Sequence, residues 1–164
     1  SDAYTVKLEG ARAVGFRTVS ITLLRDPRYV EHASVWAADI VQKCSAKICD
    51  RMKLSPEDFT LELRLIGHSA SFGALETRIS VPTEVGVVAI VTAPSQMQSD
   101  EISKILNPYL LHHPLTQEEE QPTFSFLFSP PEMQQGKVYS FTFNHVLKLD
   151  DPMDGFHLYV VHCD

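Results

Sequence analysis

Residues 61–91 read LELRLIGHSASFGALETRISVPTEVGVVAIV, and the rest of the predicted fold is arranged around them. The first part, residues 61–67, alternates leucine with polar residues, the pattern of a strand with one buried face. Residues 84–91 are almost continuously apolar and rich in valine, as expected of a strand at the centre of a sheet. The residues between are small and polar without a period. The stretch therefore predicts two central strands joined by a glycine-containing loop.

The segment before this stretch predicts another strand. Residues 16–24 alternate, with apolar Val19, Ile21 and Leu23 on one face and hydroxyl side chains on the other, which indicates a half-buried strand. Upstream of it, residues 4–8 predict a short strand. Two glycines then flank a segment that resembles a turn; they are Gly10 and Gly15.

Two helices are expected. Asp26 and Pro27 suit the N-cap and the first position of a helix over residues 27–53. A second helix is predicted over residues 96–111, and Pro108 is expected to kink or end it. In the first helix, apolar residues recur every four positions and predict a buried stripe. They are Trp36, Ile40, Cys44, Ile48 and Met52.

The order of elements predicts the fold class. It reads β-α-β-β-α-β, and extra strands are expected at 138–149 and 156–162. The simplest arrangement is an α+β ferredoxin-like (split βαβ) sandwich, with two helices on one face of an antiparallel sheet. Strand 84–93 is then expected beside strand 16–24 at the centre. Residues 1–164 are expected to form a single domain.

Composition and charge exclude some partners. The formal net charge of −7 disfavours nucleic acid and anionic membranes, and no apolar run approaches the roughly 18 residues of a membrane span. Three cysteines, an odd number, favour a reducing compartment, so a cytoplasmic protein is expected. The chain begins at Ser1 without methionine, which predicts a processed or truncated product with further sequence upstream.

Chemistry is expected, if anywhere, in the loop over residues 67–84. This loop gathers hydroxyls, glycines and three acid/base candidates, namely His68, Glu76 and Glu84. A carboxylate held beside the valine-rich strand could act as a general base. The alternative is a solvated connection between two strands, with Glu76 forming an ordinary surface contact.

Known catalytic and binding motifs are incomplete or absent from the sequence. Residues 67–71, GHSAS, approach the G-x-S-x-G nucleophile motif, but Ser71 replaces the second glycine and no helix is predicted after Ser69. Neither H-E-x-x-H nor C-x-x-C occurs, and no phosphate-binding glycine motif is present. We therefore expect neither a metal site nor a bound cofactor.

Several segments together resemble one family. They are LEGARAVGFRTVSI (8–21), RDP (25–27), RLIGHSASFGALE (64–76), TEVGVVAIVTAPSQ (83–96), LHHP (111–114), FLFSPPE (126–132) and VYSFTFNHVLKLDDP (138–152). Their order and spacing resemble the C-terminal part of the acyclic terpene utilisation, AtuA-like, proteins. The resemblance covers nearly the whole chain and implies an upstream α/β domain as partner. It also implies a link to catabolism of branched terpenoid acids as coenzyme A thioesters.

The chain departs from the family pattern in the loop. The family's loop tends to read Y-G-x-N-G-V-M-G-x-L-E-P, whereas here Ile66 replaces the tyrosine and SASF fills residues 69–72. The family's His-Glu pair before the valine-rich strand is Thr83-Glu84 here. The loop residues that still match the family are Gly67, Gly73, Glu76 and Glu84.

Three functions remain open from the sequence. The first is an assembly or substrate-shaping module serving an intracellular catabolic enzyme, with an acyl-CoA-type small molecule as a possible ligand. The second is an enzyme domain that uses the carboxylates of loop 67–84. The third is a structural homo-oligomerisation domain that uses the aromatic strand 138–149. A ligand pocket lined by the loop would favour the second, and an extensive strand-mediated dimer the third.

Overall fold

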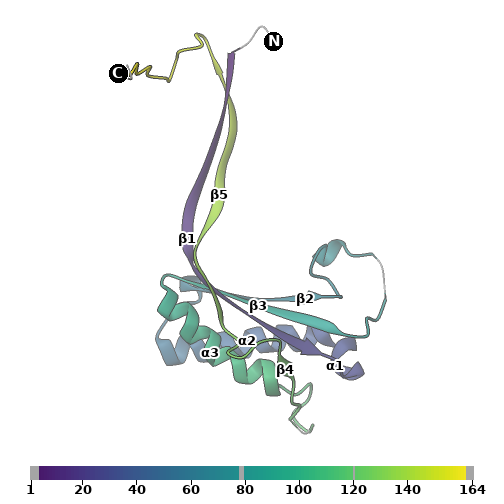
Figure 1. The fold of residues 1–164 in the computed structure, drawn as a ribbon. Coiled ribbons are helices and arrows are strands. Elements are labelled where there is room, and N and C mark those ends of the chain that lie inside the picture. Colours follow the sequence, from purple (N-terminus) through teal and green to yellow (C-terminus); the bar gives the residue numbers. More distant parts are fainter. Residues whose placement is uncertain (1–3, 78–79, 120, 162–164) are drawn as a thin grey trace. The chain divides into compact units, whose positions relative to one another are not determined.

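The computed structural model describes residues 4–77, 80–119 and 121–161 of an α+β protein (Figure 1). The chain divides into two compact units, one formed by Val14–Val138 and the other by the first 13 residues with Tyr139 onward. The described elements are β1 (Tyr4–Leu24), α1 (Pro27–Glu31), α2 (Ala33–Met52), β2 (Thr60–Ile66), β3 (Val85–Ala93), α3 (Gln96–His112), β4 (Ser125–Phe126) and β5 (Met133–Leu149), with 3₁₀ turns at Pro56–Asp58 and Gly73–Leu75.

The five strands form one antiparallel sheet in the order β2-β3-β1-β4, with β5 also paired to β1. The central pair runs from Phe16 opposite Ala93 to Leu24 opposite Val85. The prediction that residues 84–93 lie beside 16–24 is therefore confirmed. Helices α2 and α3 lie on the same side of the sheet formed by β1, β2 and β3 (Figure 1).

The first predicted helix is divided in two. Asp26 caps α1 as expected, because its carboxylate accepts the N–H of Arg28 at 2.9 Å. His32 then leaves the helical conformation, and α2 starts at Ala33, so the expected continuous helix over 27–53 is wrong. Tertiary packing accounts for the break, since α1 buries both Tyr29 and Val30 against the core.

The core lies between the sheet and the helices, and the predicted stripe of α2 forms much of it. Trp36, Ile40, Cys44 and Ile48 are all fully buried. Burial raises the pKa of the Cys44 thiol to about 12, so this thiol is an inert core group. No helix in the described ranges is both long enough and apolar enough to cross a membrane.

Strand β1 buries its hydroxyl face. Ser20 and Thr22 pair with the buried residues Ala89 and Val87 of β3, and their own side chains are fully buried. The apolar residues Ile21 and Leu23 occupy the opposite face and are only half-buried. The hydroxyl oxygens of Ser20 and Thr22 have no hydrogen-bond partner.

Replacing Thr22 by valine should stabilise the protein by about 1 kcal/mol, because a buried hydroxyl without a partner costs about 1–3 kcal/mol. Thr18 is the matched control. It is equally buried, but its hydroxyl donates to Asp100 at 2.6 Å and accepts from Gln96 at 2.8 Å. Thr18→Val should therefore destabilise by about 1–3 kcal/mol. Urea unfolding of both variants would check the two signs, and equal effects would contradict the assignment.

Two expected features of the strands are wrong. The chain does not turn between Gly10 and Gly15, because β1 continues through both as one strand of 21 residues. Residues 156–161 do not form the expected last strand, and His162 lies outside the described residues. Apolar composition alone predicted a strand there, but no neighbouring strand pairs with this segment in the described structure.

Candidate functional site

The predicted loop starts with a tight turn at the end of β2. The carbonyl oxygen of Leu65 accepts the N–H groups of three consecutive residues, His68, Ser69 and Ala70, at 3.0–3.1 Å. Gly67 has a φ of +91°, and a Cβ there would lie 3.1 Å from the carbonyl oxygen of Glu84. Glycine is therefore needed where the two ends of the loop approach each other.

The loop brings together two of the three predicted acid/base residues. His68 and Glu76 line one cavity of about 320 Å³, which Val30 and Glu31 of α1 also border. Glu84 is not among the lining residues. All three predicted side chains are exposed. Among the described residues, the side chains of His68 and Glu76 therefore line the same cavity, and Glu84 does not join them.

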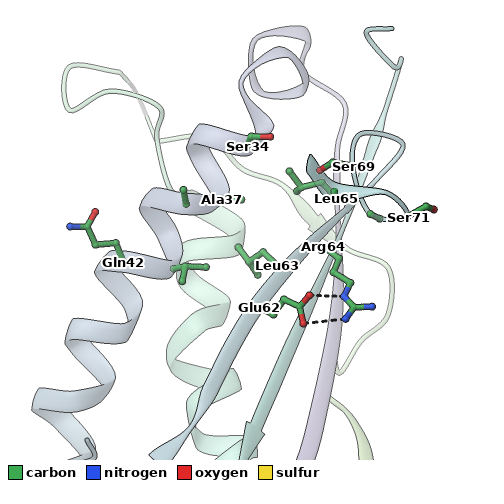
Figure 2. Close-up of a pocket in the computed structure, with 13 residues that line it drawn as sticks. Ser34, Ala37, Gln42, Glu62, Leu63, Arg64, Leu65, Ser69 and Ser71 are labelled. Carbon is green, nitrogen blue, oxygen red and sulfur yellow. Dashed lines mark hydrogen bonds and ion pairs between the residues drawn. The ribbon is translucent and has the colours of Figure 1, made fainter. Parts of the chain in front are cut away.

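A larger groove lies between α2 and the edge strand β2, with a volume of about 810 Å³ (Figure 2). Small residues of α2 such as Ser34 and Ala37 face Leu63 and Leu65 of β2 across it, and the loop closes one end. On the rim, Glu62 and Arg64 form an ion pair with Nε and Oε1 2.7 Å apart. The groove is therefore largely apolar, with a charged pair at its border.

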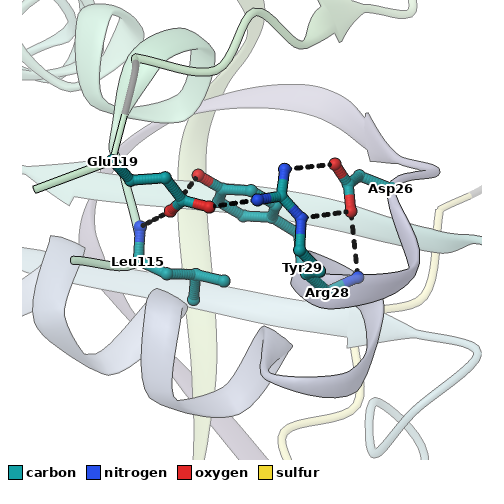
Figure 3. Close-up of polar contacts among 5 residues, drawn as sticks. All are labelled: Asp26, Arg28, Tyr29, Leu115 and Glu119. Atoms are coloured by element: carbon teal, nitrogen blue, oxygen red, sulfur yellow. Dashed lines mark hydrogen bonds and ion pairs between the residues drawn. The ribbon is translucent and has the colours of Figure 1, made fainter.

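A second polar cluster holds the acidic loop after α3 (Figure 3). The carboxylate of Glu119 accepts hydrogen bonds from Arg28 at 2.5 Å, from the Tyr29 hydroxyl at 3.1 Å and from the N–H of Leu115 at 3.2 Å. Arg28 also donates to Asp26 at 2.9 Å. The sequence predicted only an exposed acidic loop here. With its carboxylate engaged by three donors, Glu119 has a structural role.

The sequence also did not predict the contact between His113, which follows α3, and the Asp39 carboxylate of α2. His113 Nε2 lies 2.6 Å from Asp39 Oδ2, and Lys43 donates to the same oxygen at 2.7 Å. The Lys43 ammonium, with a smaller effect of His113, holds the pKa of the Asp39 carboxyl below its usual range against the opposing effect of burial. The i, i+4 spacing of Asp39 and Lys43 was the available signal. His113 was not predictable, because 74 residues separate it from Asp39.

Asp100 should make stability depend on pH. Burial raises the pKa of its carboxyl, but hydrogen bonds from Thr18, Gln96 and Gln134 outweigh burial, and the pKa lies below 3.8. A pKa lowered by folding contributes stability above the unfolded value, and this is lost as the pH falls through the folded value. The difference in unfolding free energy between wild type and Asp100→Asn should therefore shrink from about pH 6 to about pH 2.5.

The control for this prediction is Asp50→Asn, at an exposed position of α2. Its unfolding free energy should run parallel to that of wild type over the same pH range. Urea titrations at several pH values measure both differences. A constant gap for Asp100→Asn would show that its hydrogen bonds contribute no pH-dependent stability.

The described residues offer no metal centre, since no three of their His, Cys, Asp or Glu side chains come close enough to share an ion. Cys44 and Cys49 are free thiols. Comparison of the chain with family models, curated proteins and solved structures found no match.

Proposed function

We propose that this chain is an assembly module, the C-terminal domain of an AtuA-like protein, which organises a larger protein rather than performing chemistry itself. One observation carries the proposal. In the unit formed by residues 4–13 and 139–161, β1 and β5 lie side by side as a two-stranded ribbon with exposed apolar side chains (Figure 1).

The ribbon has one apolar face. A Cβ on Gly10 would lie 3.3 Å from the Cβ of Phe143, so these two residues share a face. Since side chains alternate along a strand, the even-numbered residues of β1 and the odd-numbered residues of β5 lie on that same face. Its members within the unit are Tyr4, Val6, Leu8, Gly10 and Arg12 of β1, and Tyr139, Phe141, Phe143, His145, Leu147 and Leu149 of β5.

The other face of the ribbon is mostly polar. Lys7 and Glu9 form an ion pair there, with Nζ and Oε1 2.5 Å apart. On β5 the same face carries hydroxyl, amide and ammonium groups, and Val146 is its apolar exception. The ribbon is therefore amphipathic, like a sheet that has one solvated face and one face for packing.

Large apolar side chains of this face are exposed among the described residues. Phe141 is 76% exposed and Tyr139 63%. An isolated two-stranded ribbon is marginally stable in water, and burying one phenylalanine contributes about 1.5–3 kcal/mol. A contiguous exposed apolar face of this kind is typical of a surface that binds a protein. These points support a role in assembly.

The strand order of the other unit supports a ferredoxin-like fold. The strand order β2-β3-β1-β4, antiparallel throughout, with α2 after β1 and α3 after β3, is the order of a ferredoxin-like split βαβ sandwich. We therefore propose the ferredoxin-like fold for this unit, and we propose AtuA-like membership from the sequence resemblance alone. On that basis the partners would be an upstream domain of the same protein or further copies, in the catabolism of branched acyl-CoA compounds.

Sedimentation velocity of the chain across about 1–100 µM tests the assembly role, a range that covers typical weak to moderate affinities. We expect concentration-dependent association, and Phe141→Ser with Phe143→Ser should abolish it by removing apolar area. The matched control is Ser140→Thr with Asn144→Ser, on the polar face, which should associate like wild type. A chain that remains monomeric throughout would contradict assembly by this ribbon.

Enzymatic activity is the second candidate function, because His68 and Glu76 of the loop line the same cavity. A thermal-shift and turnover screen against acyl-CoA thioesters would test it. Glu76→Gln should then abolish turnover of any thioester that is cleaved. Glu84→Gln is the informative comparison, since Glu84 does not line that cavity. Equal activity of wild type and both variants would leave the loop a structural role.

A further inference from the structure

We propose that the unit formed by Val14–Val138 binds an extended peptide of a partner protein. The peptide adds as a short antiparallel strand to the open edge of β2 and places apolar side chains in the groove beside α2. This site goes beyond the proposed assembly function, because it uses none of the residues of the ribbon. Three features point to it: the free backbone groups of β2, the groove next to them and two charges on the same strand.

Strand β2 has a neighbour on only one side among the described strands, because it ends the order β2-β3-β1-β4. Such an edge exposes unpaired backbone N–H and C=O groups, and sheets usually shield it with a bulge, a proline or a very short strand. Strand β4, at the other end of the order, has only two residues. Strand β2 has seven residues, no proline and an unbroken register with β3 from Thr60 to Ile66. Its edge is therefore open to another strand.

The open backbone groups belong to Leu61 and Leu63. The carbonyl oxygen of Leu65 accepts N–H groups of the loop rather than of β3, so the backbone groups of Leu65 point to the open edge. Since these groups alternate in direction along a strand, those of Leu61 and Leu63 point the same way. Three loop N–H groups, 3.0–3.1 Å from the Leu65 oxygen, occupy the place of an added strand there. An added strand can therefore pair with Leu61 and Leu63 but must end before Leu65.

Pairing on the far side of the sheet gives the same directions. The carbonyl oxygen of Ile21 accepts an N–H at 2.9 Å from the residue after β4, so Thr22, the next residue of β1, turns its backbone groups to β3. Carried across the register through β3, this alternation turns the backbone groups of Arg64 toward β3. Those of Leu63 and Leu65 therefore lie on the open edge.

The groove supplies side-chain contacts for the added strand. Leu63 and Leu65 of β2 face Ala37 of α2 across it (Figure 2). Residues directly opposite each other on paired strands place their side chains on the same face of the sheet. The peptide residues opposite Leu61 and Leu63 therefore point to the helix side, where the groove of about 810 Å³ lies, and these two positions favour apolar side chains.

The charges on the opposite face of β2 specify the other peptide residues. Glu62 and Arg64 are both exposed there, with Oε1 and Nε 2.7 Å apart. Opposite charges on paired strands stabilise the pair, and like charges directly opposite destabilise it. An acidic residue is therefore favoured opposite Arg64 and a basic residue opposite Glu62. Read from its N-terminus at the loop, the preferred antiparallel peptide is acidic, apolar, basic, apolar.

The edge strand of a second copy fits this site poorly. Strand β2 itself reads acidic, apolar, basic over Glu62, Leu63 and Arg64, so charge alone would let two copies pair. In that register, however, Leu61 of one copy lies opposite Leu65 of the other, where the loop already occupies the edge. A peptide that starts at the loop avoids this conflict.

Fluorescence anisotropy with two synthetic peptides tests the charge order. The peptide ELKVTGS, labelled at its C-terminus, follows the preferred order, and KLEVTGS exchanges the two charges without a change in composition. We expect the chain to bind ELKVTGS about 10-fold more tightly. Glu62→Arg with Arg64→Glu in one chain should reverse the preference. Equal binding of the two peptides, binding of neither, or a preference that the double variant does not reverse would overturn the proposal.

N-methylation of ELKVTGS tests the pairing with the edge. A methyl group on the nitrogen of the second or the fourth residue, opposite Leu63 and Leu61, should weaken binding about 10-fold, because it removes a hydrogen bond to β2. The third residue is the matched control, since its N–H points to solvent, and methylation there should have little effect. Equal losses at all three positions would overturn strand addition.

A bulky substitution tests the groove and distinguishes the peptide from a second copy. Ala38→Trp should fill the groove and abolish binding of ELKVTGS. Val35→Trp, at an exposed position of the same helix that does not line the groove, should bind like wild type. Unchanged binding by Ala38→Trp would overturn the groove as the site. Self-association of the Phe141→Ser, Phe143→Ser chain that Ala38→Trp removes would make a second copy the occupant and overturn the peptide.

Discussion

Trp36→Ala is expected to lower the free energy of unfolding by about 3–5 kcal/mol, the usual cost of removing a buried aromatic side chain. Trp36 is 1% exposed and packs edge-to-face against Tyr29 and Phe124, with ring centroids 6.4 and 5.8 Å apart. Its Nε1 donates to the carbonyl oxygen of His113 at 2.8 Å. The substitution therefore creates a cavity and leaves a buried acceptor without its donor.

Two further variants make this test specific. Val35→Ala alters the neighbouring position of the same helix, where the side chain is 70% exposed, and should change stability by less than about 0.5 kcal/mol. Trp36→Phe keeps an aromatic ring but removes the Nε1 donor, so its loss should be intermediate. Guanidinium unfolding monitored by circular dichroism measures all three. A loss below about 1 kcal/mol for Trp36→Ala would show that this packing does not stabilise the protein.

Gly15→Ala is expected to be the second large effect, with a loss of about 2–5 kcal/mol. Gly15 has a φ of +142°, and a Cβ there would lie 2.6 Å from the carbonyl oxygen of Ala93. Strain at such a dihedral costs about 1–3 kcal/mol, and forced overpacking costs a similar amount. The carbonyl belongs to the backbone of β3, which is held by pairing to β1 and β2, so it cannot easily move aside.

Gly86→Ala is the matched control in the same sheet. A Cβ at Gly86 would lie 3.5 Å from the Cβ of Ile66, an ordinary contact, and its φ is not in the positive region. We expect a change within about 1 kcal/mol for this variant. Thermal unfolding of the two alanine variants gives the comparison. Similar melting temperatures for both would contradict the idea that β1 needs glycine where it passes the end of β3.

Much of the larger unit was predictable because its signals are local. The alternation at Leu61, Leu63 and Leu65 and the valine run after Glu84 predicted β2 and β3 close to their observed bounds. The four-residue stripe that starts at Trp36 predicted the buried face of α2, because one helix must bury one contiguous side. Asp26 and Pro27 predicted the start of α1.

The candidate site was predictable only in part. The loop after β2 was expected to gather acid/base groups, and His68 and Glu76 do line one cavity. Glu84 was included because it is near in sequence, but lining a cavity depends on the path of the chain. Whether any of the three residues takes part in catalysis stays a prediction. The contacts of Glu119 with Arg28 and Tyr29, and of His113 with Asp39, escaped prediction because 74 to 91 residues separate the partners.

The sequence by itself determined the strands β2 and β3 and the buried stripe of α2, since periodicity acts over a few residues, but not the break between α1 and α2 at His32. Only the tertiary structure decided which face of β1 is buried. Alternation shows that Ser20 and Ile21 lie on opposite faces of β1, but it does not show which face is buried. The helices cover the face that carries Ser20 and its pairing partner Ala89 on β3. The tertiary structure also decided that β1 runs through Gly10 into a ribbon with β5, because pairing between residues more than 120 positions apart leaves no local signal.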